Sequence, residues 1–173
     1  MAVIIDANCI ANVFSKSSVK HPEFKPVFEW IVLGKGIMIV GGTKYQSELI
    51  KLKKYFTIIR YLKEVGKVHN GDNQNIDDYQ LTVEGLRTTM DFDDPHLPAM
   101  IVDTKCRIIC SEDTRSIPYV TDSKYYPKGT KVPVYYTSSR NKNLLCDNYV
   151  DNSLKPLCRI NKKSAERLIK LIK

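Results

Sequence analysis

Acidic side chains in this 173-residue chain recur beside short apolar runs. Asp6 and Asp113 each come directly after such a run, while Glu48 and Asp94 fall near the starts of segments with helical character. Carboxylates that crowd together repel one another unless a cation compensates them, and Mg²⁺ and Mn²⁺ prefer oxygen ligands of this kind. If the fold gathers these four acids, they would form a site for a hard divalent cation.

A divalent ion held in this way would give the acids a chemical role. It would lower the pKa of a bound water, orient that water on phosphorus and stabilise the leaving oxygen. That chemistry suits hydrolysis of a phosphodiester bond. Each acid also has a plainer interpretation: Asp6 and Asp94 are suitable helix caps, Glu48 a solvated surface acid and Asp113 a turn residue. The metal-site interpretation therefore depends on the order in which the acids follow the strands and helices.

Short apolar runs alternate with helical patterns, which predicts an α/β chain with a parallel sheet covered on both faces. Strands are predicted at residues 2–5, 37–40 and 107–110, with a further candidate at 132–136. Helices are predicted at 22–34, 43–55, 56–65, 94–105 and 162–173, and residues 70–72 as a turn that leads into another helix. Because open sheets bind ligands outside the carboxyl ends of their strands, Asp6 and Asp113 are expected to face one crevice.

The net charge of +8 lies entirely in the last third of the chain. Residues 118–173 carry 12 Lys or Arg and 4 Asp or Glu, whereas residues 1–117 carry 15 of each. Such a skew favours a polyanionic partner, with a solvated surface as the alternative. Five tyrosines lie among these cations, as in surfaces that stack single-stranded bases, although tyrosines packed over a sheet edge give the same pattern. They are Tyr119, Tyr125, Tyr126, Tyr135 and Tyr136.

Several classes of protein are excluded by composition. No basic segment precedes the first apolar run and Asp6 interrupts it, so the N-terminus is not a signal peptide. No apolar stretch approaches the roughly 20 residues of a membrane-spanning helix, and a soluble cytoplasmic protein is expected. The five cysteines show no C-x2-C spacing, which favours reduced and mostly buried thiols over a zinc site.

Four segments, taken in order, resemble the PIN-domain nucleases: VIIDANCI, YQSELIKL, DPHLPAM and IICSED. The resemblance covers residues 1–117 and implies a three-layer α/β/α fold, with residues 118–173 as a basic, Tyr- and Lys-rich extension packed on the same domain. It also implies a metal-dependent endonuclease, usually acting on RNA, whose ligands for Mg²⁺ or Mn²⁺ are Asp6, Glu48, Asp94 and Asp113. Asn8 and Ser111 would support these ligands through hydrogen bonds, or serve only as local turn and cap residues.

One departure from the family pattern concerns Pro98, which lies four residues after Asp94. A proline there removes a helical hydrogen bond and crowds the Asp94 carbonyl, so the helix is expected to begin later than residue 94. Asp91 or Asp93 could then replace Asp94 as the ligand. Beside the last strand, Glu112 competes in the same way with the acid that follows it.

The main hypothesis is therefore an RNA endonuclease that leaves a 5′-phosphate and a 3′-hydroxyl, as the resemblance implies. Compact bacterial members of the family resemble VapC-type toxins that a partner protein holds inactive, so an antitoxin or a defence-system partner is expected, and a homodimer is compatible with the chain. The rivals are a DNA-directed nuclease and a binding module without catalysis. His96, beside the expected site, is either a proton shuttle or, more commonly for its position, a surface or capping group.

Overall fold

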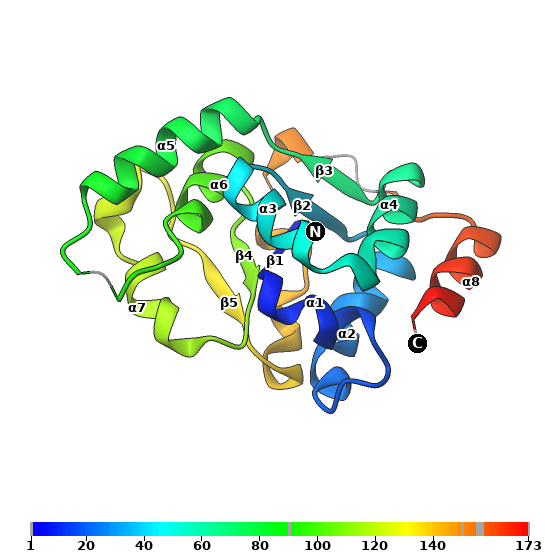
Figure 1. The fold of residues 1–173 in the computed structure, drawn as a ribbon. Coiled ribbons are helices and arrows are strands. Elements are labelled where there is room, and N and C mark those ends of the chain that lie inside the picture. Colours follow the sequence, from blue (N-terminus) through cyan, green and yellow to red (C-terminus); the bar gives the residue numbers. More distant parts are fainter. Residues whose placement is uncertain (1, 90, 150, 155–157, 173) are drawn as a thin grey trace.

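A five-stranded, all-parallel sheet forms the centre of the molecule, with strands in the order β3-β2-β1-β4-β5 (Figure 1). The computed structural model describes residues 2–89, 91–149, 151–154 and 158–172. The strands are β1 (Ala2–Ile5), β2 (Ile37–Val40), β3 (Val68–Asn70), β4 (Ile108–Cys110) and β5 (Val134–Tyr136). Residues of β1, β2 and β4 are buried throughout, as expected for strands that are covered on both faces. The predicted α/β class with a central parallel sheet is confirmed.

Helices cover both faces of this sheet and make it a three-layer α/β/α fold. The chain runs from β1 outwards through β2 to β3, then returns to the other side of β1 at β4 and continues to β5. Because crossovers between parallel strands are right-handed, the helices of these two halves cover opposite faces. They are α1 (Ile10–Phe14), α2 (His21–Val32), α3 (Thr43–Lys51), α4 (Phe56–Glu64), α5 (Asn73–Gly85), α6 (His96–Thr104), α7 (Ile117–Val120) and α8 (Lys162–Leu171).

The helix predicted from Thr43 to Tyr55 is shorter in the structure. It ends at Lys51, and Leu52 separates it from a single 3-10 turn at Lys53–Tyr55. Gly42 rather than Thr43 is the N-cap residue, with a φ of 77° that side chains rarely adopt. Thr43 instead binds Asp77 of α5, through its backbone N–H to Oδ1 at 2.7 Å and its hydroxyl to Oδ2 at 2.5 Å.

No strand was predicted at β3; a turn was expected from residue 70, which is instead the last residue of the strand. Its residues pair in parallel with β2, and the pairing is extended at both ends by hydrogen bonds from Met38 N to Lys67 O and from Gly71 N to Val40 O. The Lys67 ammonium is buried and donates to the carbonyls of Gly34, Gly36 and Cys158 at 2.8–3.0 Å. β3 has three residues, and two of them are a histidine and an asparagine, so its sequence shows no apolar pattern.

The C-terminal extension is part of the same sheet, because β5 pairs in parallel with β4. α8 packs against α2 and α4, and its apolar residues Ala165 and Leu168 are buried, as is Ile172 directly after it, so it docks on the core of its own chain. Four of the five tyrosines named as base-stacking candidates are buried, and the fifth, Tyr119, stacks on Phe92 with ring centroids 5.7 Å apart. The base-stacking interpretation was therefore wrong.

Two further sequence expectations concern cysteines and membranes. Cys9, Cys106 and Cys110 are buried free thiols, Cys146 is half-buried and Cys158 is exposed. None of the helices in the described part of the chain is long and apolar enough to cross a membrane.

Gly42 is expected to be the glycine most sensitive to substitution in the turn that starts α3. A Cβ there would lie 2.6 Å from Ile76 Cγ2 in addition to requiring a positive φ. Gly42→Ala should lower the free energy of unfolding by roughly 3 kcal/mol, which corresponds to a fall of about 6–12 °C in Tm. Gly129→Ala is the matched control, since Gly129 also has a positive φ but its Cβ would meet nothing within 4 Å. Equal losses in thermal unfolding of the two variants would contradict the steric part of this prediction.

Candidate functional site

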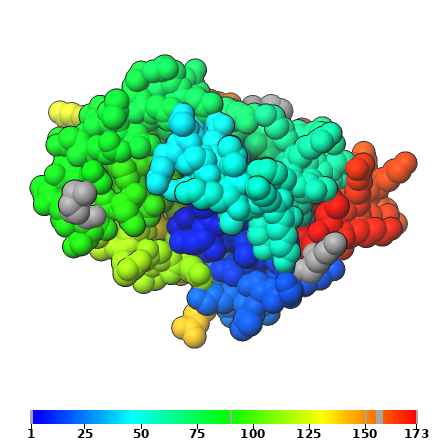
Figure 2. All heavy atoms as spheres, viewed as in Figure 1, coloured from blue at the N-terminus to red at the C-terminus, as the bar shows by residue number. Residues whose placement is uncertain are grey.

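Asp6 and Asp113 lie at the point where the strand order of the sheet reverses. β1 and β4 are neighbours there, and Asp6 N donates to Cys110 O at 2.9 Å just beyond their paired residues. In open α/β sheets this reversal leaves a crevice outside the carboxyl ends of the strands. The segment after β1 (dark blue) reaches the surface there, between α3 (cyan) and the yellow-green segment after β4 (Figure 2).

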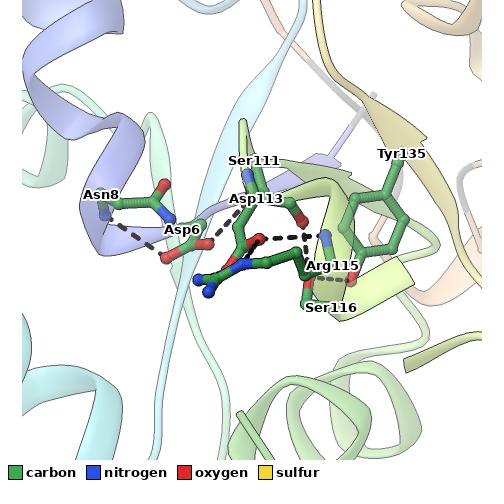
Figure 3. Close-up of polar contacts among 7 residues, drawn as sticks. All are labelled: Asp6, Asn8, Ser111, Asp113, Arg115, Ser116 and Tyr135. Atoms are coloured by element: carbon green, nitrogen blue, oxygen red, sulfur yellow. Dashed lines mark hydrogen bonds and ion pairs between the residues drawn. The ribbon is translucent and has the colours of Figure 1, made fainter. Parts of the chain in front are cut away.

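Ser111 connects the two acids directly (Figure 3). Its hydroxyl donates to Asp6 Oδ2 at 2.7 Å, and the backbone N–H of Asp113 donates to the same hydroxyl oxygen at 3.0 Å. Asp6 is buried, and its Oδ1 also accepts a longer bond of 3.4 Å from the backbone N–H of Asn8. Asp6 therefore begins the 3-10 turn at Ala7–Cys9 and also faces the crevice, so capping and a place in the site are compatible.

Glu48 reaches the same region from α3. One turn before it, the buried Tyr45 donates its hydroxyl proton to the carbonyl of Ile5, which ties this helix to the end of β1. The two carboxylate oxygens of Glu48 have different neighbours: Oε1 lies 3.2 Å from Lys44 Nζ, and Oε2 lies 3.7 Å from His96 Nε2. Glu48 is thus placed between a cation and the start of α6.

Asp94 does not cap a helix with its side chain. α6 begins at His96, two residues later than the predicted helix, with Pro95 in the N-cap position. Pro98 lies in the first turn, where the missing N–H has no partner within the helix, and this explains the later start. The Asp94 carbonyl accepts from Leu97 N at 3.1 Å, which leaves its half-buried carboxylate to face the other acids.

The position of His96 in the sequence suggests a surface or capping residue, but in the structure His96 is neither. It is 1% exposed, and burial lowers its pKa to about 4 although Glu48 acts in the opposite direction. The ring is therefore neutral at pH 7 and its contact with Glu48 is not an ion pair. Its Nδ1 atom is buried without a hydrogen-bond partner among the described residues.

The charges of the four acids act on one another. Burial and, in decreasing order, the negative charges of Asp6, Asp93, Glu48 and Asp113 together raise the pKa of Asp94 to about 7. The pKa of Asp6 is raised as well, mainly by burial and with a contribution from Glu48, while hydrogen bonds from Ser111 and Asn8 oppose the shift. Asp94 thus lies within the electrostatic influence of Asp6, Glu48 and Asp113.

Asp113 differs from Asp6 and Asp94 because a cationic side chain binds both of its carboxylate oxygens. Arg115 donates from Nε to Oδ1 at 3.0 Å and from Nη2 to Oδ2 at 2.9 Å, and these hydrogen bonds lower the pKa of Asp113. Both residues lie on the segment after β4, with the arginine side chain 87% exposed. Asp113 is therefore kept as an anion, but a metal ion would have to displace the Arg115 side chain from its carboxylate oxygens.

The alternative ligands occupy different places. Asp91 and Asp93 are exposed, and of these two only Asp93 contributes to the field at Asp94. Glu112 binds Lys20 at 2.6 Å and accepts from Asn12 Nδ2 at 3.3 Å, so its carboxylate is engaged towards α1 and the loop before α2.

Tyr135 of β5 also borders the acids, which the sequence did not indicate (Figure 3). Its hydroxyl lies 3.3 Å from Ser116 Oγ. Burial raises its pKa, and the charges of Asp94, Asp6 and Asp113 act in the same direction. The alternation of strand side chains in 132–136 was the one signal that could have placed it on the face of the acids.

The donor set has the chemistry of a Mg²⁺ or Mn²⁺ site, since all four members are carboxylates and the pKa of Asp94 is raised by burial and by the negative charges of its neighbours. A divalent cation would provide that compensation. No three His, Cys, Asp or Glu side chains in the described part of the chain are grouped tightly enough to hold one ion. Ion binding would therefore require these side chains to move closer together.

Comparisons with models of protein families, with characterised proteins and with solved structures gave no significant match to this chain.

The raised pKa of Asp94 predicts a pH-dependent stability. Its carboxyl takes up a proton on folding between about pH 4 and 7, so its contribution to the free energy of unfolding falls as pH rises through that window. In metal-free buffer, Asp94→Asn should therefore be more stable than wild type at pH 8 by roughly 1–2 kcal/mol, which is a Tm increase of about 2–8 °C, and gain much less at pH 4.5.

Thermal unfolding at the two pH values measures this difference. Asp78→Asn, which removes an exposed acid from α5, controls for the loss of one negative charge. The prediction fails if Asp94→Asn shows the same shift at both pH values or is destabilised at pH 8.

Proposed function

We propose that this chain is a metal-dependent endonuclease that hydrolyses phosphodiester bonds in RNA and acts as a toxin or defence effector. The observation that carries the proposal is the meeting of Asp6 and Asp113 at the carboxyl ends of the two central strands, with Ser111 hydrogen-bonded to both. Ligands bind at this point of open α/β sheets. The order of the acids along the chain resembles that in the PIN-domain nucleases, and this resemblance also supports the proposal.

Asp6, Glu48, Asp94 and Asp113 would hold the Mg²⁺ or Mn²⁺ ion, which when bound supplies an activated water and stabilises the leaving oxygen. Ser111 fixes the orientation of Asp6, and Tyr45 fixes the helix that carries Glu48. Asp6 is buried, so this part of the crevice is shielded from bulk water. Electrostatic interactions are stronger in such a shielded region than in water. His96, neutral at pH 7, adds no positive charge that would oppose a cation.

RNA as the substrate is supported by charge and by the family resemblance. The net charge of +8 attracts a polyanion, and Lys44 and Arg115 stand beside the acids where a backbone phosphate would approach. Metal-assisted hydrolysis itself does not distinguish ribose from deoxyribose, so a DNA-directed nuclease is the nearest alternative. Matched RNA and DNA oligonucleotides in one cleavage assay separate the two.

A binding module without catalysis is the second candidate, and two observations favour it. Arg115 occupies both oxygens of Asp113, and the acids in the described part of the chain are not drawn together into a ready metal site. Calorimetric titration with Mn²⁺ discriminates, because a binding module need take up no ion at these acids, whereas the nuclease must.

Loss of either central acid should abolish cleavage. Asp6→Asn and Asp113→Asn are each expected to reduce the rate of Mn²⁺-dependent cleavage of single-stranded and structured RNA by at least about 100-fold, since even outer-shell partners of a metal typically contribute 10- to 100-fold. Asp78→Asn, with the same chemical change on the exposed surface of α5, should retain the wild-type rate. Full activity of the purified Asp6→Asn and Asp113→Asn variants would sink the proposal.

Removal of Arg115 should strengthen metal binding. Arg115→Gln frees both oxygens of Asp113, and because an exposed ion pair contributes at most about 1 kcal/mol, the affinity for Mn²⁺ is expected to increase by up to about fivefold. Isothermal titration calorimetry measures the change. Lys124→Gln, which breaks the 3.3 Å ion pair between Lys124 and Asp122, should leave the affinity unchanged. Weaker Mn²⁺ binding by Arg115→Gln would show that the guanidinium helps rather than competes.

A further inference from the structure

A groove of about 1000 Å³ lies beside β3, apart from the residues that surround Asp6 and Asp113. Its walls come from α3 and α4, with Arg167 and Leu171 of α8 at one end. β3 is at the edge of the sheet, and α4 packs against both β3 and α8, so the groove follows this edge (Figure 1). Hereafter it is called the β3 groove.

The backbone of β3 offers hydrogen-bonding groups towards the outside of the sheet. In the parallel pairing with β2, the bonds Met38 N to Lys67 O and Gly71 N to Val40 O show that alternate residues 67, 69 and 71 face β2. The N–H and C=O groups of Val68 and Asn70 therefore point away from it. Both residues line the groove. No strand of the described residues pairs with this edge, and such an edge is a template for a further strand.

Two apolar side chains stand exposed on the wall of the groove. Ile50 of α3 is 59% exposed and Phe56 of α4 is 42% exposed, while the neighbouring Leu49 is buried. Large apolar side chains that gather beside a hollow mark an interaction surface rather than ordinary scatter. An added strand would present every second side chain to them.

The charge of the groove is positive. Glu64 is its one acid among the described lining residues, and it already accepts from Arg60 Nε at 3.0 Å. Lys63 and Arg167 form no ion pair within the part of the chain that the structure describes, and Arg167 lies over the Tyr61 ring with 4.2 Å between its guanidinium carbon and the centroid. The groove thus has two cations to offer to an acidic ligand.

We propose that the β3 groove binds an extended, acidic segment of a partner protein, which adds to β3 as a sixth strand and places apolar side chains on Ile50 and Phe56. A second copy of this chain is disfavoured because it would bring the same cations face to face. Single-stranded RNA is disfavoured because the guanidinium of Arg167 already covers the face of Tyr61, and because a strand edge matches the hydrogen-bond spacing of a peptide. This inference does not depend on the nuclease proposal.

A labelled peptide of about seven residues that alternates valine with glutamate is the probe. Fluorescence anisotropy at low salt should show binding to the full chain, weaker binding at high salt, and no binding of a valine–lysine peptide or of a valine–glutamate peptide with a central proline. Hydrogen exchange supplies the structural readout: the bound peptide should protect the N–H groups of Val68 and Asn70, while His69, already paired with β2, changes little.

Charge-reversal variants test the surface itself. Lys63→Glu and Arg167→Glu together should weaken binding by about tenfold, whereas Lys16→Glu, on an exposed residue after α1 that does not line the groove, should not. Ile50→Ser, which removes apolar surface without adding charge, should weaken binding to a similar extent at low and high salt. The proposal is overturned if no acidic peptide binds at about 1 mM, or if the proline-containing peptide binds equally well. It is also overturned if Val68 and Asn70 gain no protection from exchange. A short RNA that competes with the peptide, and whose binding is lost in Lys63→Glu, would overturn it as well.

Discussion

β1 and β4 are hydrogen-bonded neighbours, although two other strands and six helices lie between them in the described sequence. Right-handed crossovers in opposite directions produce this arrangement, and they leave the carboxyl ends of the two strands without a helix that covers both. Asp6 and Ser111, 105 positions apart in sequence, meet there at 2.7 Å. The other parts of the site are positioned relative to this pair: α3 through the bond from Tyr45 to Ile5, and β5 through its pairing with β4.

Gathering acids at such a point has an electrostatic cost, and the chain reduces it unequally. Asp113, at the surface, gains two hydrogen bonds from Arg115 and its pKa falls. Half-buried Asp94 has no such cationic partner among the described residues, and burial together with the charges of its acidic neighbours raises its pKa to about 7. The difference follows from solvent access and from the cation beside Asp113. In a site organised in this way the electrostatic free energy is least favourable at the centre, so a divalent cation bound there would bring the largest stabilisation.

The sequence was informative where a residue's surroundings follow from its neighbours in the chain. Buried runs such as Ala2–Ile5 and Ile37–Val40 predict strands, and an acid directly after such a run predicts its own place at the rim. It failed for β3, where pairing with β2 overrides a polar composition, and for Tyr135, whose place beside Asp94 depends on strand order. It failed also for His96, since burial of a first-turn residue depends on what α6 packs against.

The buried tyrosines change how the positive charge of the last third can act. Tyr125, Tyr126, Tyr135 and Tyr136 anchor this part of the chain, and the hydroxyl of Tyr136 donates to Glu23 O of α2 at 2.7 Å. The lysines and arginines of this region that the structure describes are therefore displayed from a folded surface. A polyanion that meets ordered cations need not bear the entropy of ordering a tail, so more of the electrostatic attraction is retained as affinity.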